Sequence, residues 1–355
     1  MTSKERVLCA FDRVPADRVP VDYTANAGID LRLKAHFGLA ENDGEGLLKA
    51  LGVDFRNVGP RYTGPVLHEN NIPDRQIDPQ SGIHRRWIEH SSGGYWDYCD
   101  FPLEFADEET VAAWKLPSPD DFDYETVLDQ IAKHREYAVC FPCFGDYING
   151  NGMLRGMEQT LIDLVTDDPA GLLLGKRRFE LQTGMIERVL DRAKGGIDIL
   201  WIGEDLGTQI GQMISIDTFR KHLKPLYQPM IDLAKHYGAR VMIHTCGSSS
   251  WAYEDFIAMG VDAADTLQPE AVNMSPRYLA DTFGGRLSFH GCISTAGPLA
   301  FGKVADVTED VRATLEIMLP TNSYMLCPTH AIQDNSPTEN VLEMYHAART
   351  LGIYR

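Results

Sequence analysis

The chain has 355 residues, of which 44% are hydrophobic, so it is long enough for one large core or for two domains. Its 51 acidic and 33 basic residues give a formal net charge of −18, which argues against nucleic acid as a partner because phosphate binding needs clustered Lys and Arg. Seven scattered cysteines, and the lack of an apolar stretch as long as a signal peptide or a membrane span, predict a cytoplasmic protein that does not enter a membrane.

Short apolar or β-branched runs recur along the chain, and helix-like stretches follow most of them. Eight strands are expected, at Val19–Tyr23, Phe55–Val58, Val139–Cys143, Ile197–Ile202, Arg240–Ile243, Asp262–Leu267, Leu287–His290 and Tyr324–Cys327. Helices are expected after the last five strands, at Thr218–His236, Ala252–Met259, Ser275–Phe283, Val307–Met318 and Thr338–Leu351.

This alternation predicts an α/β fold with a parallel sheet and helical crossovers, closed into a (β/α)8 TIM barrel. A doubly wound open sheet is the alternative, although no GxGxxG motif follows the first expected strand. No long linker divides the chain, so residues 1–355 are predicted to form a single domain.

The segment from about Arg75 to Leu103 interrupts the alternation. Two aromatic-rich runs flank the sequence SSGG, which predicts a β-hairpin with a glycine-rich turn. Such an insertion could lie near the mouth of the barrel, and a surface excursion is the alternative.

The segment Val241–Gly247 carries the main candidates for chemistry. His244 and Cys246 lie two residues apart where a strand ends, so their side chains point to the same side of an extended chain. Imidazole and thiolate together suit Zn²⁺, and the catalytic residues of a parallel barrel lie at the C-terminal ends of its strands. The structural alternative is a buried strand histidine beside a buried cysteine.

Other strand ends could complete such a site. Cys327 and His330 lie at the end of the last expected strand, and Cys292 follows the seventh, so each is a candidate third ligand of a catalytic zinc. Glu204 and Asp205 follow the fourth strand, and we expect one of these adjacent side chains to point inward. We predict that Glu204 does so, as a proton-handling group or a metal ligand, with a helix cap as its alternative role.

These motifs together resemble the uroporphyrinogen decarboxylase superfamily. The segments GEDLGTQ, HTCG and CPTHAIQDNSPTENV match it in order and spacing over the C-terminal two-thirds of the chain, and RVLCAFDRVPADRVPVDY resembles its start. The decarboxylase's arginine-rich signature is replaced here by YTANAGIDLRLK. The HxC pair matches instead the zinc motif of the superfamily's corrinoid methyltransferases, whose third ligand, a Cys, corresponds to His330 in this chain.

The resemblance implies a zinc-dependent methyltransferase that moves a methyl group between a small O-, N- or S-methylated substrate and a corrinoid-binding partner protein. The implied zinc ligands are His244, Cys246 and His330, with Cys327 or Cys292 as alternatives to His330, and Glu204 is the implied catalytic group. A decarboxylase-like lyase acting on a carboxylated substrate is the alternative enzyme, and a corrinoid-binding module without turnover is a third reading. A homodimer is compatible with the sequence, which leaves the oligomeric state open.

Overall fold

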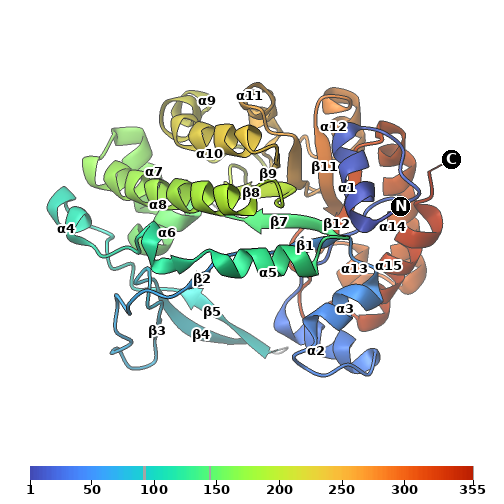
Figure 1. Cartoon of the computed structure of the whole chain (residues 1–355), viewed down its shortest axis with the longest axis horizontal. Coiled ribbons are helices and arrows are strands. Elements are labelled where there is room, and N and C mark those ends of the chain that lie inside the picture. The colour runs from blue at the N-terminus through green and yellow to red at the C-terminus, as the bar shows by residue number, and fades with distance from the viewer. Residues whose placement is uncertain (91–92, 144, 355) are drawn as a thin grey trace.

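A curled parallel sheet forms the centre of the computed structural model, which describes residues 1–90, 93–143 and 145–354 (Figure 1). The sheet has seven strands in the order β1-β7-β8-β9-β10-β11-β12, and every neighbouring pair is parallel. The strands are β1 (Phe55–Asn57), β7 (Ala138–Pro142), β8 (Ile199–Gly203), β9 (Arg240–Thr245), β10 (Ala263–Thr266), β11 (Ser288–Ile293) and β12 (Tyr324–Pro328). The predicted α/β class and parallel sheet are therefore confirmed, in a TIM-barrel-like arrangement.

The sheet curls far enough to bring distant strands into contact through their side chains. The ring of His290 on β11 lies 5.3 Å from the ring of Phe55 on β1 and 5.6 Å from that of Trp201 on β8, measured between centroids. Because β1 and β11 lie near opposite edges of the sheet, these contacts cross the inside of the curl. Side chains thus fill its interior.

The first predicted strand, Val19–Tyr23, does not form as a strand. Val21 makes only an isolated parallel bridge to Leu326 of β12. On its other side, the Val21 carbonyl accepts a hydrogen bond from the amide of Asp54, which directly precedes β1. The ladder stays short because Pro20 has no N–H to donate, and because the Asp54 carboxylate accepts the Val21 amide at 2.9 Å in place of a strand carbonyl. This segment therefore links the two edges of the sheet by two backbone hydrogen bonds to Leu326 on one side and by contacts with Asp54 on the other.

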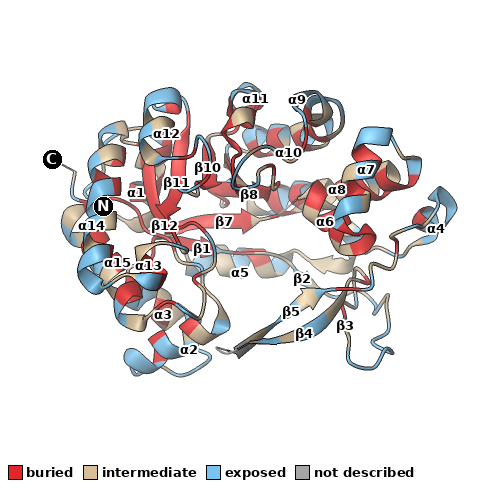
Figure 2. Ribbon diagram, turned by 180° about the vertical axis from the view of Figure 1, so that it is seen from behind, coloured by how far each residue is buried: buried red, intermediate tan, exposed pale blue. Residues whose placement is uncertain are grey.

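Helices cover the outside of the sheet, and their outward sides carry most of the exposed residues (Figures 1 and 2). Within the described ranges, no helix combines the length and apolar character needed to cross a bilayer. The α-helices are α1 (Ser3–Asp12), α2 (Ala27–His36), α3 (Gly44–Leu51), α4 (Glu108–Ala113), α5 (Glu125–Lys133), α6 (Tyr147–Arg155), α7 (Met157–Thr166), α8 (Pro169–Ala193), α9 (Ile216–Thr218), α10 (Lys224–His236), α11 (Tyr253–Met259), α12 (Pro276–Phe283), α13 (Pro298–Phe301), α14 (Val304–Met318) and α15 (Thr338–Leu351).

The predicted helix Thr218–His236 is divided in the structure. It consists of the end of α9, a π-helical turn at Phe219–Leu223, and α10. Pro225 lies in the first turn of α10 and Pro229 lies inside it, so neither position supplies a backbone N–H to the helix. By contrast, the predicted helix Thr338–Leu351 is confirmed as α15 without a change in its bounds.

Two small antiparallel sheets accompany the main one. Strands β2 (Arg61–Tyr62) and β6 (Phe122–Asp123) form one, and β3 (Gln76–Ile77), β4 (His84–His90) and β5 (Gly93–Tyr98) form the other. Both views place the three-stranded sheet to one side of the parallel sheet (Figures 1 and 2). Residues 91 and 92 of the predicted SSGG turn lie outside the described ranges, and its two glycines are the first residues of β5. A position beside the barrel mouth stays a prediction for this hairpin.

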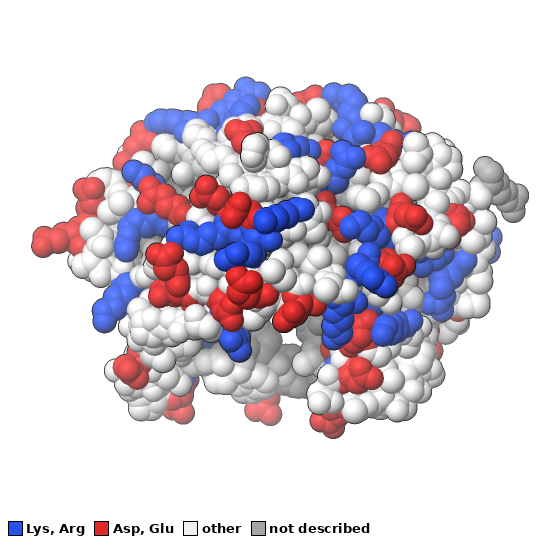
Figure 3. Space-filling model, in the orientation of Figure 1, with Lys and Arg blue, Asp and Glu red and all other residues white. Residues whose placement is uncertain are grey.

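Charged residues of both signs are interspersed on the face shown in Figure 3. Arg188 pairs with Asp120 at 2.6 Å, and Arg192 pairs with Glu125 at 2.9 Å. Exposed pairs of this kind each contribute little to stability, on the order of 0–1 kcal/mol.

Candidate metal centre

His244 and Cys246 meet at the C-terminal end of β9, as their spacing predicts. His244 belongs to the strand and Cys246 directly follows it, and 3.5 Å separates the Nε2 atom of His244 from the Sγ atom of Cys246. The next residue, Gly247, has φ +67° and packs against the loop after β8. A Cβ atom at Gly247 would lie 2.2 Å from the carbonyl oxygen of Gly207, so only glycine fits this turn.

Asp205 is the third member of this cluster. Its Oδ1 atom accepts the backbone amide of Cys246 at 2.8 Å and lies 3.7 Å from Nε2 of His244. One ligand atom from each of Asp205, His244 and Cys246 lies within 4.8 Å of the others, and all three residues are partly accessible. This set of oxygen, nitrogen and sulfur donors fits Zn²⁺, which accepts all three types.

Asp265 on β10 contacts the imidazole of His244 at Nδ1, the ring nitrogen that does not face Cys246. Its Oδ2 atom lies 2.7 Å from Nδ1 of His244, which is also 2.8 Å from the hydroxyl of Thr266. Burial would raise the pKa of Asp265, but the neighbouring His290 and His244 hold that pKa below its ordinary value. The ionised carboxylate therefore accepts the Nδ1 proton and leaves Nε2 directed at the cluster, which is the usual carboxylate–histidine arrangement behind a metal ligand.

The same contacts change the pKa of His244. Burial alone would lower the pKa of His244, but hydrogen bonds to Asp265 and Cys246 raise it well above its ordinary value. Burial also raises the pKa of the Cys246 thiol. Metal binding at this cluster would therefore have to displace protons from both residues.

His330 and Cys327 lie near His244 but outside the Asp205–His244–Cys246 cluster. Both line a cavity of about 240 Å³ together with His244, Asp265 and Thr24. Within the described part of the chain, His330 is not a member of the Asp205–His244–Cys246 cluster, and its Nδ1 atom lies 3.3 Å from the side-chain amide of Gln333. Cys327 belongs instead to a second, buried cluster with Asp22 and His290.

Cys292, the other alternative ligand, is buried on β11 opposite Cys327 of β12. Burial raises the pKa of its thiol. Cys292 joins neither cluster of potential ligands among the residues that the structure describes.

Glu204 points away from His244, so the structure brings Asp205 rather than Glu204 to the cluster. The Glu204 side chain is fully buried and accepts the backbone amides of Tyr147 at 2.7 Å and Ile148 at 3.0 Å, at the start of α6. The hydroxyl of Tyr227 lies between this carboxylate, at 2.8 Å, and the carbonyl oxygen of Gly203, at 2.6 Å. Burial, reinforced by the charge of Asp146, raises the pKa of Glu204 well above its ordinary value. The contacts are those of a cap on a helix N-terminus.

This placement predicts the effect of Glu204→Gln. The amide has one acceptor oxygen, so its NH2 group would face a backbone N–H of α6, and we expect a loss of about 1–3 kcal/mol in the free energy of unfolding. Urea denaturation would measure it. Tyr227→Phe, which removes the hydroxyl beside the same carboxylate, is the matched control and should cost about 1 kcal/mol with the metal content unchanged. Loss of metal from Glu204→Gln at unchanged stability would support the catalytic role expected from the sequence.

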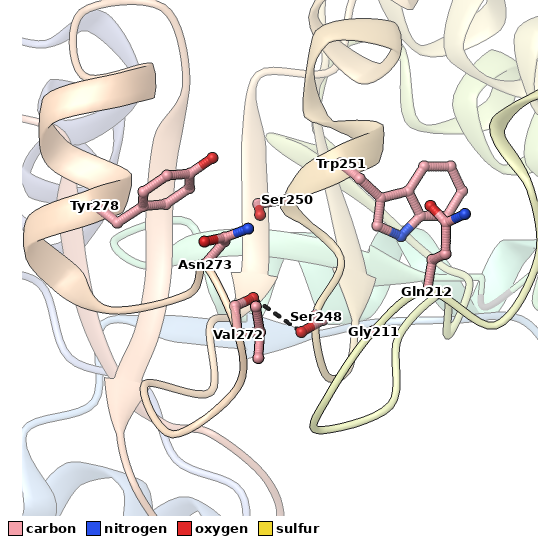
Figure 4. Close-up of a pocket in the computed structure, with 8 residues that line it drawn as sticks. All are labelled: Gly211, Gln212, Ser248, Ser250, Trp251, Val272, Asn273 and Tyr278. Carbon is pink, nitrogen blue, oxygen red and sulfur yellow. Dashed lines mark hydrogen bonds between the residues drawn. The ribbon is translucent and has the colours of Figure 1, made fainter.

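A larger pocket of about 400 Å³ lies beside the loops that follow β8, β9 and β10. Trp251 and Tyr278 flank it from opposite sides, and the Ser248 hydroxyl donates to the Val272 carbonyl between them at 2.8 Å (Figure 4). None of the residues that line this pocket belongs to either ligand cluster. The smaller cavity at His244 is therefore the candidate reaction site.

Sequence reasoning missed the two aspartates that complete this centre. The sequence did indicate that Asp265 needs polar partners, because an ionisable side chain in the short run AADT must be paired when the strand is buried. For Asp205 the sequence offered only a choice between two adjacent carboxylates.

The architecture and the donor atoms together define a class of protein, namely a TIM-barrel-like α/β protein with a candidate metal centre at the ends of its strands. Sequence comparison adds a family match over the second half of the chain. The family model described as Uroporphyrinogen decarboxylase (URO-D) matches residues 180–351, the part of the chain that carries Asp205, His244, Cys246 and Asp265. The resemblance drawn from the motifs is thereby confirmed.

Solved structures show the same fold. The chain is similar to a methyltransferase from Methanosarcina mazei, with a TM-score of 0.63 and 18% sequence identity over 98% of each chain. At this identity the likeness establishes the shared fold. No curated protein sequence matches the chain significantly.

Proposed function

We propose that this protein is a zinc-dependent methyltransferase that moves a methyl group between a small O-, N- or S-methylated substrate and a corrinoid carried by a partner protein. The observation that carries the proposal is the Asp205–His244–Cys246 cluster, with His244 oriented by Asp265. The fold shared with a solved methyltransferase supports it.

The chemistry divides between the metal and the residues of this chain. A zinc ion at the cluster would supply Lewis acidity, which makes the heteroatom of a methylated substrate a better leaving group or favours the thiolate form of an acceptor. His244 Nε2, Cys246 Sγ and an oxygen of Asp205 would hold the ion, and Asp265 keeps the Nδ1 proton of His244 away from it. The cavity of about 240 Å³ provides room for a small substrate beside His244.

His330 keeps the role expected of it within this proposal. It lines the same cavity as His244, so it is placed to approach the metal or the substrate from the end of β12. We place the site at the mouth of a single-domain (β/α)8 barrel in which residues 19–23 take the eighth position and the β4–β5 hairpin lies near the mouth. The corrinoid domain of the partner would then dock at this mouth.

Methyl transfer to free cob(I)alamin, a stand-in for the partner's cofactor, tests the proposal. The purified protein would be incubated with methylated amines, alcohols, thiols or methoxylated aromatics, and the absorption spectrum would report methylation of cobalt. We expect at least one donor class to react, the reaction to stop after chelation, and zinc to restore it. Decarboxylation of a carboxylated substrate by the chelated protein, with no methyl transfer by the zinc-loaded form, would favour the lyase named in the family description.

A further inference from the structure

A second cluster of potential ligands lies inside the curled sheet. Asp22, His290 on β11 and Cys327 on β12 each place one ligand atom within 4.8 Å of the others. All three are buried, with exposed fractions of 7%, 0% and 2% respectively. Three segments that are distant in the sequence thus bring an oxygen, a nitrogen and a sulfur donor together.

The imidazole of His290 has one nitrogen satisfied and the other directed into this cluster. Its Nδ1 atom lies 2.6 Å from Oδ1 of Asp265. Its Nε2 atom is buried and makes no hydrogen bond of good geometry, although Oδ2 of Asp22 lies within ion-pairing distance at 3.3 Å. A buried polar nitrogen of this kind is costly unless something binds it.

One carboxylate therefore orients two histidines toward two different clusters. Asp265 contacts His244 through Oδ2 and His290 through Oδ1, in each case at the Nδ1 nitrogen. Nε2 of His244 lies 3.5 Å from Sγ of Cys246 and 3.7 Å from Oδ1 of Asp205, and Nε2 of His290 lies 3.3 Å from Oδ2 of Asp22. The buried cluster thus repeats the donor set of the cluster at the end of β9, including the carboxylate behind the histidine.

From this geometry we propose that Asp22, His290 and Cys327 form a second binding site for a divalent cation such as Zn²⁺. A divalent cation would neutralise the carboxylate of Asp22 and displace the proton of the Cys327 thiol, so that the buried site would carry no uncompensated charge. Oδ1 of Asp22 already accepts the amide of Tyr23 at 2.8 Å, which leaves Oδ2 for the ion. Cys327 lines the same cavity as His244, so that cavity provides an entry path and space for a fourth, non-protein ligand.

Metal stoichiometry tests this site separately from the one at His244. After zinc loading and removal of free metal, elemental analysis should find about two equivalents of zinc per chain in the wild type and about one in Cys327→Ala or Asp22→Asn. Cys292→Ala removes a buried cysteine on the neighbouring strand that belongs to neither cluster, and it should retain both equivalents. Two equivalents in Cys327→Ala, or one in the wild type that disappears on loss of His244 and Cys246, would overturn the proposal.

If Cys327→Ala does not fold, a spectroscopic measurement on another variant can still test the second site. The double variant His244→Ala/Cys246→Ala leaves the buried cluster intact and, loaded with Co²⁺, should show a thiolate-to-cobalt charge-transfer band from Cys327. Absence of bound cobalt in this folded variant would refute the second site while leaving the first untouched. A wild type that binds cobalt only through Cys327 would support the second site and count against the proposed function.

Discussion

Replacing His244 and Cys246 together by alanine is expected to abolish the proposed binding of zinc at the end of β9 and to slow the proposed methyl transfer on the order of 10³-fold or more. The estimate follows from the several kcal/mol that a Lewis-acidic metal contributes to such a reaction. Two of the three clustered donors disappear in this variant, and Asp205 alone cannot hold the ion. Elemental analysis and the cob(I)alamin assay would measure the two effects.

Cys9→Ala is a matched control for this variant. Cys9 lies in α1 and is partly accessible like Cys246, but it belongs to neither ligand cluster. The control should keep its zinc and its rate. Full activity in the double variant would show that the reaction does not depend on these side chains.

Asp265→Asn is expected to have the second largest effect, because one carboxylate serves two buried histidines. An amide offers one acceptor oxygen, so its NH2 group would face Nδ1 of either His244 or His290. Breaking a buried charged network in this way should cost about 3 kcal/mol in the free energy of unfolding. Loss of the group that orients a metal-binding histidine should also weaken zinc binding roughly 10- to 100-fold.

Denaturation of the chelated protein would separate the two effects of Asp265→Asn. The matched control is Asp262→Asn, just before β10, where the partly exposed carboxylate pairs with Lys235 and accepts the amide of Val241. Its amide can still accept that N–H, so the loss should stay below about 1 kcal/mol. If both variants lost the same free energy of unfolding, the contact of Asp265 with the two histidines would contribute no more stability than the partly exposed contacts of Asp262.

The strands of the parallel sheet could be predicted with small errors at their ends. Arg240–Ile243 became β9 (Arg240–Thr245), and Phe55–Val58 became β1 (Phe55–Asn57). The signal is strong because strands buried on both faces are continuous apolar runs, and helices of a different periodicity separate them. The prediction of Val19–Tyr23 was wrong because its hydrogen bonds depend on Pro20 and on the Asp54 side chain, which local patterns do not show.

The sequence by itself determined that the protein has an α/β fold and that His244 and Cys246 lie on the same side of the chain at a strand end. Both follow from local regularities, namely the alternation of strands with helices and the two-residue repeat of an extended strand. Only the tertiary structure decided that Asp205 faces these residues while Glu204 caps α6, and that Cys327 joins Asp22 and His290 instead. The reason is physical: each of these contacts joins segments far apart in the chain, and the curl of the sheet determines which of them meet.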